Sequence, residues 1–149
     1  SSQTLSKRAR LQFDAIKKLR TADPARLTIR FDKALLETKK LLGKPLPKDI
    51  LIVLGSDSGM KRLKHLFWGK PAVSDVVSFN YGKGQSPQWE IFINLEQAKR
   101  QAKTTFADEI VFLFIHGVLH NLSYDDDTPR KRAHMLELGS RILASCLSA

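Results

Sequence analysis

Two histidines and a run of three aspartates are the residues best suited to chemistry. His116 and His120 stand four positions apart near the end of an apolar stretch, and Asp125, Asp126 and Asp127 follow shortly after. On an α-helix with about 3.6 residues per turn, positions i and i+4 point the same way, so both imidazoles can bind one metal ion. A carboxylate from the acidic run could then provide a further ligand.

Other roles for these residues stay open from their spacing alone. A histidine in a buried helix needs a partner, which can be a hydrogen-bond acceptor instead of a metal ion. The aspartates could equally solvate a loop and stabilise the start of the next helix. Histidine and carboxylate ligands suit nickel, iron or manganese as well as zinc. Glu109, about two turns before His116, belongs either to the helix start or to the surroundings of the site.

The stretch that carries the histidines is predicted to be a buried helix over residues 106–121. Its apolar residues leave no polar face, so the helix must be surrounded by protein nearly all round. These residues are Ile110, Val111, Phe112, Leu113, Phe114, Ile115, Val118 and Leu119.

The rest of the chain supplies the elements that would position this helix. Apolar periodicity, capping residues and turn residues predict helices over residues 5–19, 24–42, 56–68, 95–103 and 129–147, and strands over 50–54, 76–81 and 89–93. The first residues of the 5–19 segment could instead form an edge strand. The last two strands are expected to pair as an antiparallel hairpin. This order predicts one α+β (mixed α/β) domain over residues 1–149, with a small, mostly four-stranded mixed sheet packed against about five helices.

The sequence also bears on the compartment of the protein. Cys146 is the single cysteine and lies at helical spacing from apolar residues, so it is expected to be a small core residue without a disulfide partner in the chain. No apolar run approaches the length that a bilayer requires, and the N-terminal residues lack the core of a signal peptide. We therefore expect a cytoplasmic protein that does not enter a membrane.

The net charge of +10 is concentrated in the first 70 residues. These residues carry 17 of the 25 Lys and Arg but only six of the 15 Asp and Glu. One cluster lies near the N-terminus, and another contains Lys61, Arg62, Lys64 and Lys70. Such clusters attract polyphosphate by Coulomb forces and counterion release, which favours RNA or DNA as a partner. The alternative is a solvated surface that keeps the protein soluble.

Several motifs occur in the order of a known family. The segment His116-Gly-Val-Leu-His120-Asn-Leu-Ser-Tyr124-Asp125-Asp126 resembles the H-G-x-L-H-L-x-G-Y-D-H signature of the YbeY family, which comprises zinc-dependent endoribonucleases of rRNA maturation. Upstream, residues 67–70, 74–79 and 90–93 are similar to the family's Y-R-G-K, T-D-V-L-S-F and G-D-I-x-I segments. The resemblance covers about residues 50 to 147 and implies a small mixed sheet packed against helices.

The resemblance implies one Zn²⁺ per chain and a set of ligands. His116 and His120 would be the first two ligands, and Asp126 stands where the family has a third histidine. Two histidines and one carboxylate form a known catalytic zinc set with an open position for water. The added negative charge should make the ion a weaker Lewis acid. Asp125 and Asp127 compete with Asp126 for this role.

Other positions depart from the family pattern. Trp68 replaces the arginine of Y-R-G-K, Lys64 replaces the asparagine of an L-N motif, and Ser123 replaces the loop glycine. A guanidinium near the metal would neutralise charge on phosphoryl oxygens, which an indole cannot do. Lys64 or Lys70 could substitute electrostatically, so both are predicted as catalytic residues beside the two histidines. Trp68 either stacks on an unpaired base or packs at a helix end.

The favoured hypothesis is a metal-dependent, single-strand-specific endoribonuclease acting in rRNA maturation and ribosome quality control, with rRNA precursors and the ribosome as partners. The alternative is a catalytically impaired RNA- or ribosome-binding protein that keeps the fold. A zinc hydrolase acting on small molecules would leave the basic residues unexplained. Peptide hydrolysis is disfavoured, because Gly117 occupies the place of the glutamate in the H-E-x-x-H motif of metallopeptidases.

Overall fold

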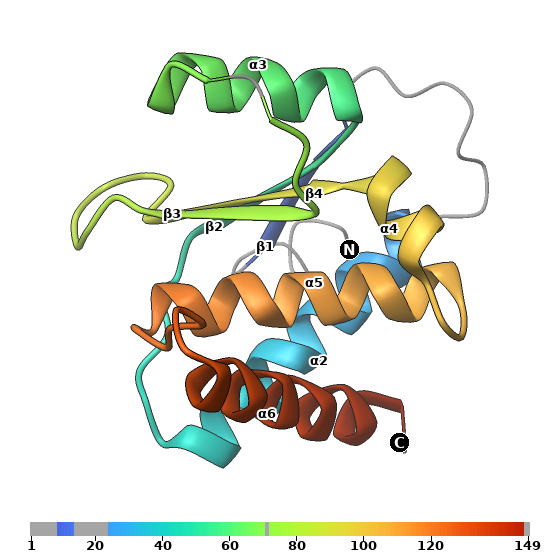
Figure 1. The fold of residues 1–149 in the computed structure, drawn as a ribbon. Coiled ribbons are helices and arrows are strands. Elements are labelled where there is room, and N and C mark those ends of the chain that lie inside the picture. The colour runs from blue at the N-terminus through green and yellow to red at the C-terminus, as the bar shows by residue number, and fades with distance from the viewer. Residues whose placement is uncertain (1–8, 14–23, 71, 148–149) are drawn as a thin grey trace.

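The computed structural model describes residues 9–13, 24–70 and 72–147. Along this part of the chain the elements are β1 Ala9–Phe13, α2 Pro24–Leu42, β2 Ile50–Gly55, α3 Asp57–Trp68, β3 Val76–Asn80, β4 Trp89–Asn94, α4 Leu95–Gln101, α5 Phe106–Asn121 and α6 Pro129–Leu147 (Figure 1). The predicted α+β class is confirmed, with a four-stranded mixed sheet and five helices among the described residues. That residues 1–149 form one domain stays a prediction.

The sheet has the strand order β1-β2-β4-β3, so β3 lies at one edge. Strands β1, β2 and β4 are parallel, whereas β3 runs antiparallel to β4. The predicted hairpin of residues 76–81 and 89–93 is therefore confirmed. Its register places Val76 opposite Ile93 and Asn80 opposite Trp89.

The helix predicted over residues 5–19 is wrong where the structure describes that segment. Residues 9–13 form β1, which pairs with β2 from Ala9 opposite Ile50 to Phe13 opposite Leu54. The alternative of an edge strand is confirmed here, because pairing with a neighbouring strand outweighs a local preference for helix. Residues 5–8 and 14–19 of the predicted helix lie outside the described residues.

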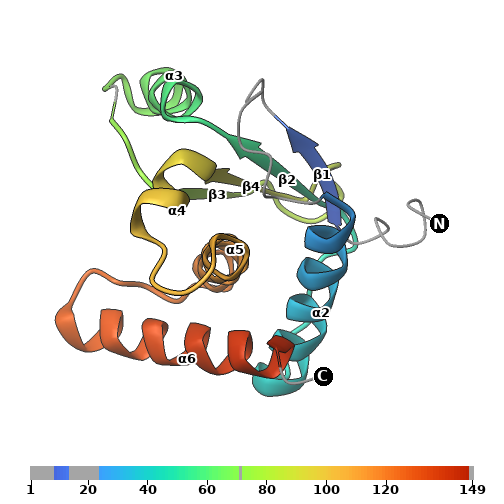
Figure 2. The ribbon, with the colours of Figure 1, turned by 90° about the vertical axis from the view of Figure 1, so that its right-hand side faces the viewer.

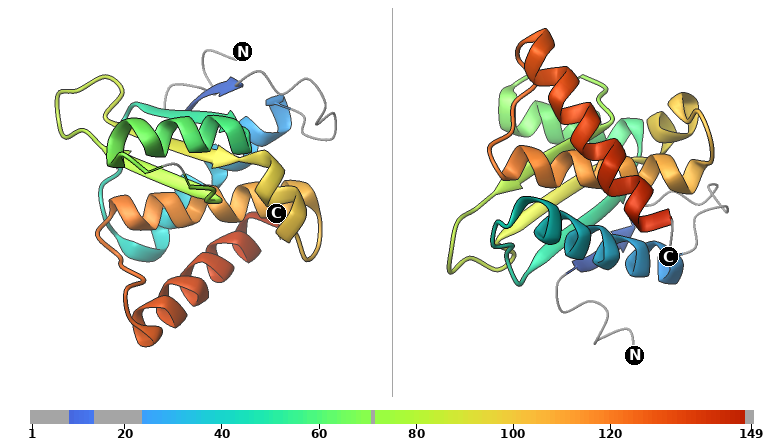
Figure 3. Two further views of the ribbon diagram at one scale, coloured as in Figure 1. Left: turned by 45° about the horizontal axis from the view of Figure 1, so that its top comes forward. Right: turned by 90° about the horizontal axis from the view of Figure 1, so that it is seen from below.

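Helices cover both faces of the sheet. Helix α3 lies on one face, and α2, α5 and α6 lie on the other (Figure 1). In the turned view, α5 is seen almost end-on, enclosed by the sheet, α2 and α6 (Figure 2). Seen from below, α6 crosses α5 on the side away from the sheet (Figure 3). None of the helices among the described residues is long and apolar enough to cross a membrane.

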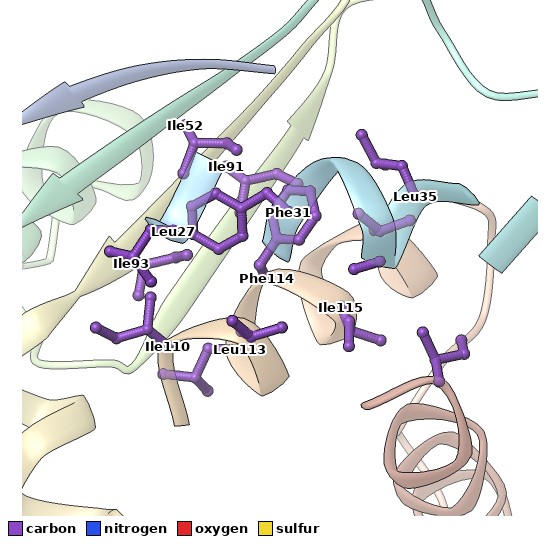
Figure 4. Packing of buried hydrophobic residues seen from close by; sticks show 14 of the residues in the cluster. Leu27, Phe31, Leu35, Ile52, Ile91, Ile93, Ile110, Leu113, Phe114 and Ile115 are labelled. Atoms are coloured by element: carbon purple, nitrogen blue, oxygen red, sulfur yellow. The ribbon is translucent and has the colours of Figure 1, made fainter. Parts of the chain in front are cut away.

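Helix α5 is at the centre of the hydrophobic core. The ring of Phe114 lies 4.5 Å from that of Phe31 on α2, centroid to centroid. Ile52, Ile91 and Ile93 of the sheet face the same cluster (Figure 4). The prediction of a helix buried nearly all round is confirmed, and Cys146 of α6 is 8% exposed, as expected for a core residue.

Capping residues set the ends of the helices that carry site residues. The Ser56 hydroxyl accepts a hydrogen bond from the Gly59 amide at the start of α3. The Thr105 hydroxyl accepts from the Asp108 amide at the start of α5. Side-chain oxygens at these positions satisfy amides that have no partner inside the helix. The guanidinium of Arg30 binds the Asp108 carboxylate at 2.6 Å, which ties α2 to the beginning of α5.

Candidate metal centre

The two histidines lie on one face of the C-terminal half of α5. Their Nε2 atoms are 3.2 Å apart, and their rings meet edge to face at 82° with centroids 4.7 Å apart. The side chain of His116 is 17% exposed and that of His120 is 32% exposed. The predicted i, i+4 pair is therefore held by a buried helix while its polar edges remain accessible.

Gly117 lets α5 approach the sheet between the two histidines. A Cβ at this position would lie 2.9 Å from Cγ2 of Ile91 on β4 and 3.4 Å from Cγ2 of Val76 on β3. Interiors are packed too closely for an added methyl group to fit there without movement of the helix or the strands. The absence of a side chain at residue 117 thus sets how near the histidines lie to the sheet.

A tight turn follows α5 and leads into the acidic run. The amide of Ser123 bonds to the His120 carbonyl at 2.9 Å, and the amide of Tyr124 bonds to the Leu119 carbonyl at 3.0 Å. Ser123 has a φ of 74°, in the left-handed region that favours glycine. The ammonium of Lys44 lies 4.5 Å from the centroid of the Tyr124 ring. These contacts direct the chain back towards the histidines.

Asp126 is the aspartate that this turn places beside both histidines. Its Oδ2 atom lies 3.7 Å from Nε2 of His116 and 3.5 Å from Nε2 of His120. Asp125 and Asp127 are exposed, and Asp127 pairs with Lys131 at 3.4 Å. His116, His120 and Asp126 form the single group of at least three His, Cys, Asp or Glu side chains with converging ligand atoms in the part of the chain that the structure describes.

The separations of these donor atoms suit one small cation. In a tetrahedral zinc site with ligands at about 2.0–2.2 Å, neighbouring ligand atoms are about 3.3–3.6 Å apart. The separations of 3.2, 3.5 and 3.7 Å are close to this range. The triad is therefore compatible with a metal ion. In the absence of an ion, the 3.2 Å separation also allows one imidazole to donate a hydrogen bond to the other.

The electrostatic surroundings favour the neutral form of His116. Burial lowers the pKa of its imidazole, and the neighbouring His120 lowers it further. Asp75 and Asp126 act in the opposite direction, but the pKa remains below its ordinary value. Neutral imidazole is the form that binds a metal ion, so the protein itself prepares this side chain for ligation.

A second polar group lies near the start of α5. The side-chain amide of Gln101 donates hydrogen bonds to Asp75 at 3.1 Å and to Glu109 at 2.8 Å. Burial raises the pKa of Glu109, while the hydrogen bond from Gln101 lowers it. Asp75 was not predicted as a site residue, although its charge raises the pKa of His116. The signal was its place in the segment that resembles T-D-V-L-S-F.

A pocket of about 550 Å³ opens beside His120. It is lined by Lys64, Trp68, Lys70, Ala72, Val76, Val77, Ser78, His120 and Asn121. The pocket lies between the C-terminal end of α3, the edge strand β3 and the end of α5. Both lysines that were predicted as catalytic residues therefore reach the pocket that contains a predicted metal ligand. Their catalytic role stays a prediction.

Trp68 packs at a helix end, which was one of the two roles predicted for it, and its stacking on an unpaired base stays a prediction. Its ring stacks on Phe79 of β3, with centroids 5.9 Å apart and 20° between the planes, so it packs at the end of α3. The side chain is nevertheless 56% exposed and lines the pocket. An indole fixed on one face and open on the other can still meet a planar ligand.

A family model described as Endoribonuclease YbeY matches residues 13–146. The chain belongs to the YbeY family. The resemblance found in the motifs is thereby confirmed. Among its curated relatives, an Endoribonuclease YbeY of Thermus thermophilus is 30% identical over 129 residues, which cover 81% of this chain and 92% of that protein.

The alignments with two other members of the YbeY family cover smaller shares of those proteins. The Endoribonuclease YbeY of Chlorobium phaeovibrioides is 34% identical over 87 residues, 56% of this chain and 59% of that protein. That of Myxococcus xanthus is 32% identical over 130 residues, 81% of this chain and 43% of that protein. The solution structure of TM1509 from Thermotoga maritima has the same fold, with a TM-score of 0.59 and 22% identity over 93% of this chain and 88% of that one.

Proposed function

We propose that this member of the YbeY family is a metal-dependent, single-strand-specific endoribonuclease that acts in rRNA maturation and ribosome quality control. Its proposed cofactor is one Zn²⁺ per chain, its partners are rRNA precursors and the ribosome, and its compartment is the cytoplasm. The curated relatives carry the name of an endoribonuclease. The observation that carries the proposal is the convergence of His116, His120 and Asp126 beside a pocket lined by two lysines.

The metal ligands in this proposal are His116, His120 and Asp126. When bound, a zinc ion would supply a Lewis acid that polarises a water molecule or a phosphoryl oxygen. The carboxylate of Asp126 offsets more of the ion's charge than a neutral imidazole would, so the Lewis acid is weaker than with three histidines. The burial of α5 in apolar surroundings holds the helix that carries both imidazoles in a defined position.

The lysines have a separate task in this proposal. Lys64 and Lys70 line the pocket beside His120, where their ammonium groups would hold the phosphates of the RNA backbone. A lysine is a point charge without the planar fork of an arginine, so it neutralises phosphoryl charge with less control over geometry. Apart from the two lysines, no side chain among the described residues that line the pocket is available as a separate general base, because His120 is a metal ligand in this proposal.

One observation favours a second function. Trp68 stands where the family pattern has an arginine, and its indole lines the pocket beside His120. An indole cannot neutralise developing charge on phosphate. The alternative is therefore a catalytically impaired RNA- or ribosome-binding protein that keeps the fold and the metal.

Cleavage of a labelled single-stranded RNA tests the choice between these functions. The zinc-loaded protein is compared with its His120→Ala variant, and with His134→Ala as a control because His134 is exposed on α6. An endoribonuclease loses at least about 100-fold in rate in the first variant and keeps its rate in the second. A duplex of the same sequence should resist cleavage. Equal residual cleavage by all three proteins would contradict the proposed endoribonuclease activity and favour the RNA- or ribosome-binding protein.

A further inference from the structure

Four aromatic side chains gather where α3 meets the end of β3. Phe67 and Trp68 close α3, Phe79 lies on β3, and Tyr81 follows that strand. The Phe79 ring is central: its centroid lies 4.8 Å from that of Phe67, 5.9 Å from that of Trp68 and 6.0 Å from that of Tyr81. We call these four side chains the aromatic platform. The C-terminal end of α3 lies over the end of β3 in Figure 1.

The aromatic platform faces solvent. Phe67 is 55% exposed, Trp68 is 56% exposed and Tyr81 is 43% exposed. The planes of Trp68 and Tyr81 lie within 20° and 12° of the plane of Phe79. The hydroxyl of Tyr81 donates to Glu90 at 2.8 Å, which holds its ring in this orientation. Apolar surface that is grouped and oriented in this way costs solvation free energy and commonly marks a binding site.

Charge indicates what the aromatic platform binds. Lys64 and Lys70 lie beside Trp68 in the lining of the pocket that reaches His120. Proteins that bind single-stranded nucleic acid combine a basic groove, which follows the backbone, with aromatic rings on which successive bases stack. A protein partner would not need cations next to flat, nearly parallel rings, whereas a polyanion with unpaired bases uses both.

We propose that the aromatic platform is a base-stacking subsite for single-stranded RNA. Unpaired bases stack on the exposed faces of Trp68 and its neighbours, while Lys64 and Lys70 bind the phosphates that lead towards His120. This subsite rests on the proposed function to the extent that the ligand is RNA. It does not require cleavage, because stacking and phosphate contacts involve none of the metal ligands. It gives Trp68 a role in place of the arginine that the family pattern carries.

The test is a binding measurement with two probes of equal charge. One probe is a 3′-labelled ten-nucleotide 2′-O-methyl oligoadenylate, and the other has the same backbone without bases. The zinc-loaded chain should bind the first probe about tenfold more tightly, since stacking on aromatic rings strengthens binding per base by roughly this factor or more. Trp89 is 3% exposed, so quenching of tryptophan fluorescence on binding would report on Trp68. A gel after each titration checks that the probe is intact.

Variants then locate the effect. Trp68→Ala and Tyr81→Ala should each lose about tenfold in affinity for the probe with bases and little for the abasic probe. Trp68→Phe should keep most of the affinity. Leu66→Ala is the matched control, because Leu66 is 72% exposed on the same helix but lies outside the aromatic platform.

The subsite is overturned if both probes bind equally well and Trp68→Ala changes neither. It is also overturned if sedimentation shows a dimer that Trp68→Ala dissociates, since a second copy would then cover the rings. Loss of cleavage alone, with the difference between the probes intact, would count against the proposed enzyme and leave the subsite standing.

Discussion

The metal triad and the aromatic platform each contribute one residue, His120 and Trp68, to the lining of the same pocket, and the structure supports the two groups differently. His116 and His120 are carried by a helix that is buried nearly all round and approaches Ile91 closely at Gly117. Trp68 and Tyr81 are about half exposed, and both pack against Phe79 of the edge strand β3. Ligands of a metal ion need positions defined to a fraction of an ångström, whereas stacked bases tolerate a looser surface.

Divergence from the family pattern occurs in both regions but differs in kind. The two histidines and the glycine between them keep that pattern, whereas Asp126 in the triad and Trp68 and Lys64 beside the pocket depart from it. A change in the triad must preserve both charge and position, so it is restricted to a residue such as Asp126 that can still bind a cation. A change on the exposed surface alters which ligands bind without disturbing the core.

The largest effect is expected at Asp126. Removal of partners that only support a metal ligand typically costs 10–100-fold in affinity or activity, so loss of a ligand should cost at least about 100-fold. Asp126→Ala should therefore lose zinc affinity and RNA cleavage together, measured by calorimetry and by initial rates. Asp125→Ala and Asp127→Ala are matched controls, because both side chains are exposed. If either control has the larger effect, the assignment of the third ligand moves to that residue.

Gly117→Ala should destabilise the protein, because it disturbs the close packing of α5 against the sheet. The added methyl group meets Ile91 and Val76, and overpacking of this kind lowers the free energy of unfolding by about 1–3 kcal/mol despite the better helix propensity of alanine. Gly139→Ala on α6 is the control, since its Cβ would approach only the Phe112 ring, at 3.2 Å, and that ring can move. Urea unfolding measures both variants. Equal stability of the two would mean that close packing at Gly117 is not required.

Lys64→Ala should weaken RNA binding moderately and leave zinc binding unchanged. Loss of one phosphate contact should weaken RNA affinity by about three- to tenfold and reduce the dependence of binding on salt by about one unit of slope. Lys39→Ala, on the exposed side of α2, is the matched control. Titrations at several salt concentrations measure both quantities. A change in zinc affinity, or no change in the salt slope, would contradict the division of tasks between the metal triad and the lysines that line the pocket.

Ser123→Gly should have the smallest effect, and it should raise the free energy of unfolding instead of lowering it. Ser123 has a φ of 74°, which costs a residue with a Cβ about 1–2 kcal/mol relative to glycine. Glycine loses more conformational entropy on folding, so we expect a net stabilisation of about 0.5–1 kcal/mol in urea unfolding. A lower stability of the variant would show that the serine side chain contributes more than the strain costs.

The sequence predicted the triad well because its geometry is largely local. His116 and His120 are brought together by the helix period alone, and Asp126 follows after one turn of chain. The hairpin and the ends of α2, α3 and α5 also depend on nearby turn and capping residues. The strain at Ser123 could have been anticipated, because the resembling motif has glycine at that position.

Features that depend on distant parts of the chain were predicted less well, and the edge strand β1 was given only as an alternative to a helix. The strand β1 forms because residues 9–13 pair with β2, some 40 residues later, and no local pattern reports that pairing. The charge of Asp75, which directly precedes β3, raises the pKa of His116 on α5. The aromatic platform joins residues from the end of α3 with residues of the hairpin, so only Trp68 was considered for base stacking and the grouping of the four rings was not predicted.

The most direct test of the central claim is a crystal structure of the zinc-soaked protein with anomalous diffraction collected at the zinc edge. We expect a single strong peak per chain at about 2.0–2.2 Å from Nε2 of His116, Nε2 of His120 and a carboxylate oxygen of Asp126. A peak elsewhere, with the two imidazoles bonded to each other and no density between them and Asp126, would contradict the metal centre and the nuclease built on it.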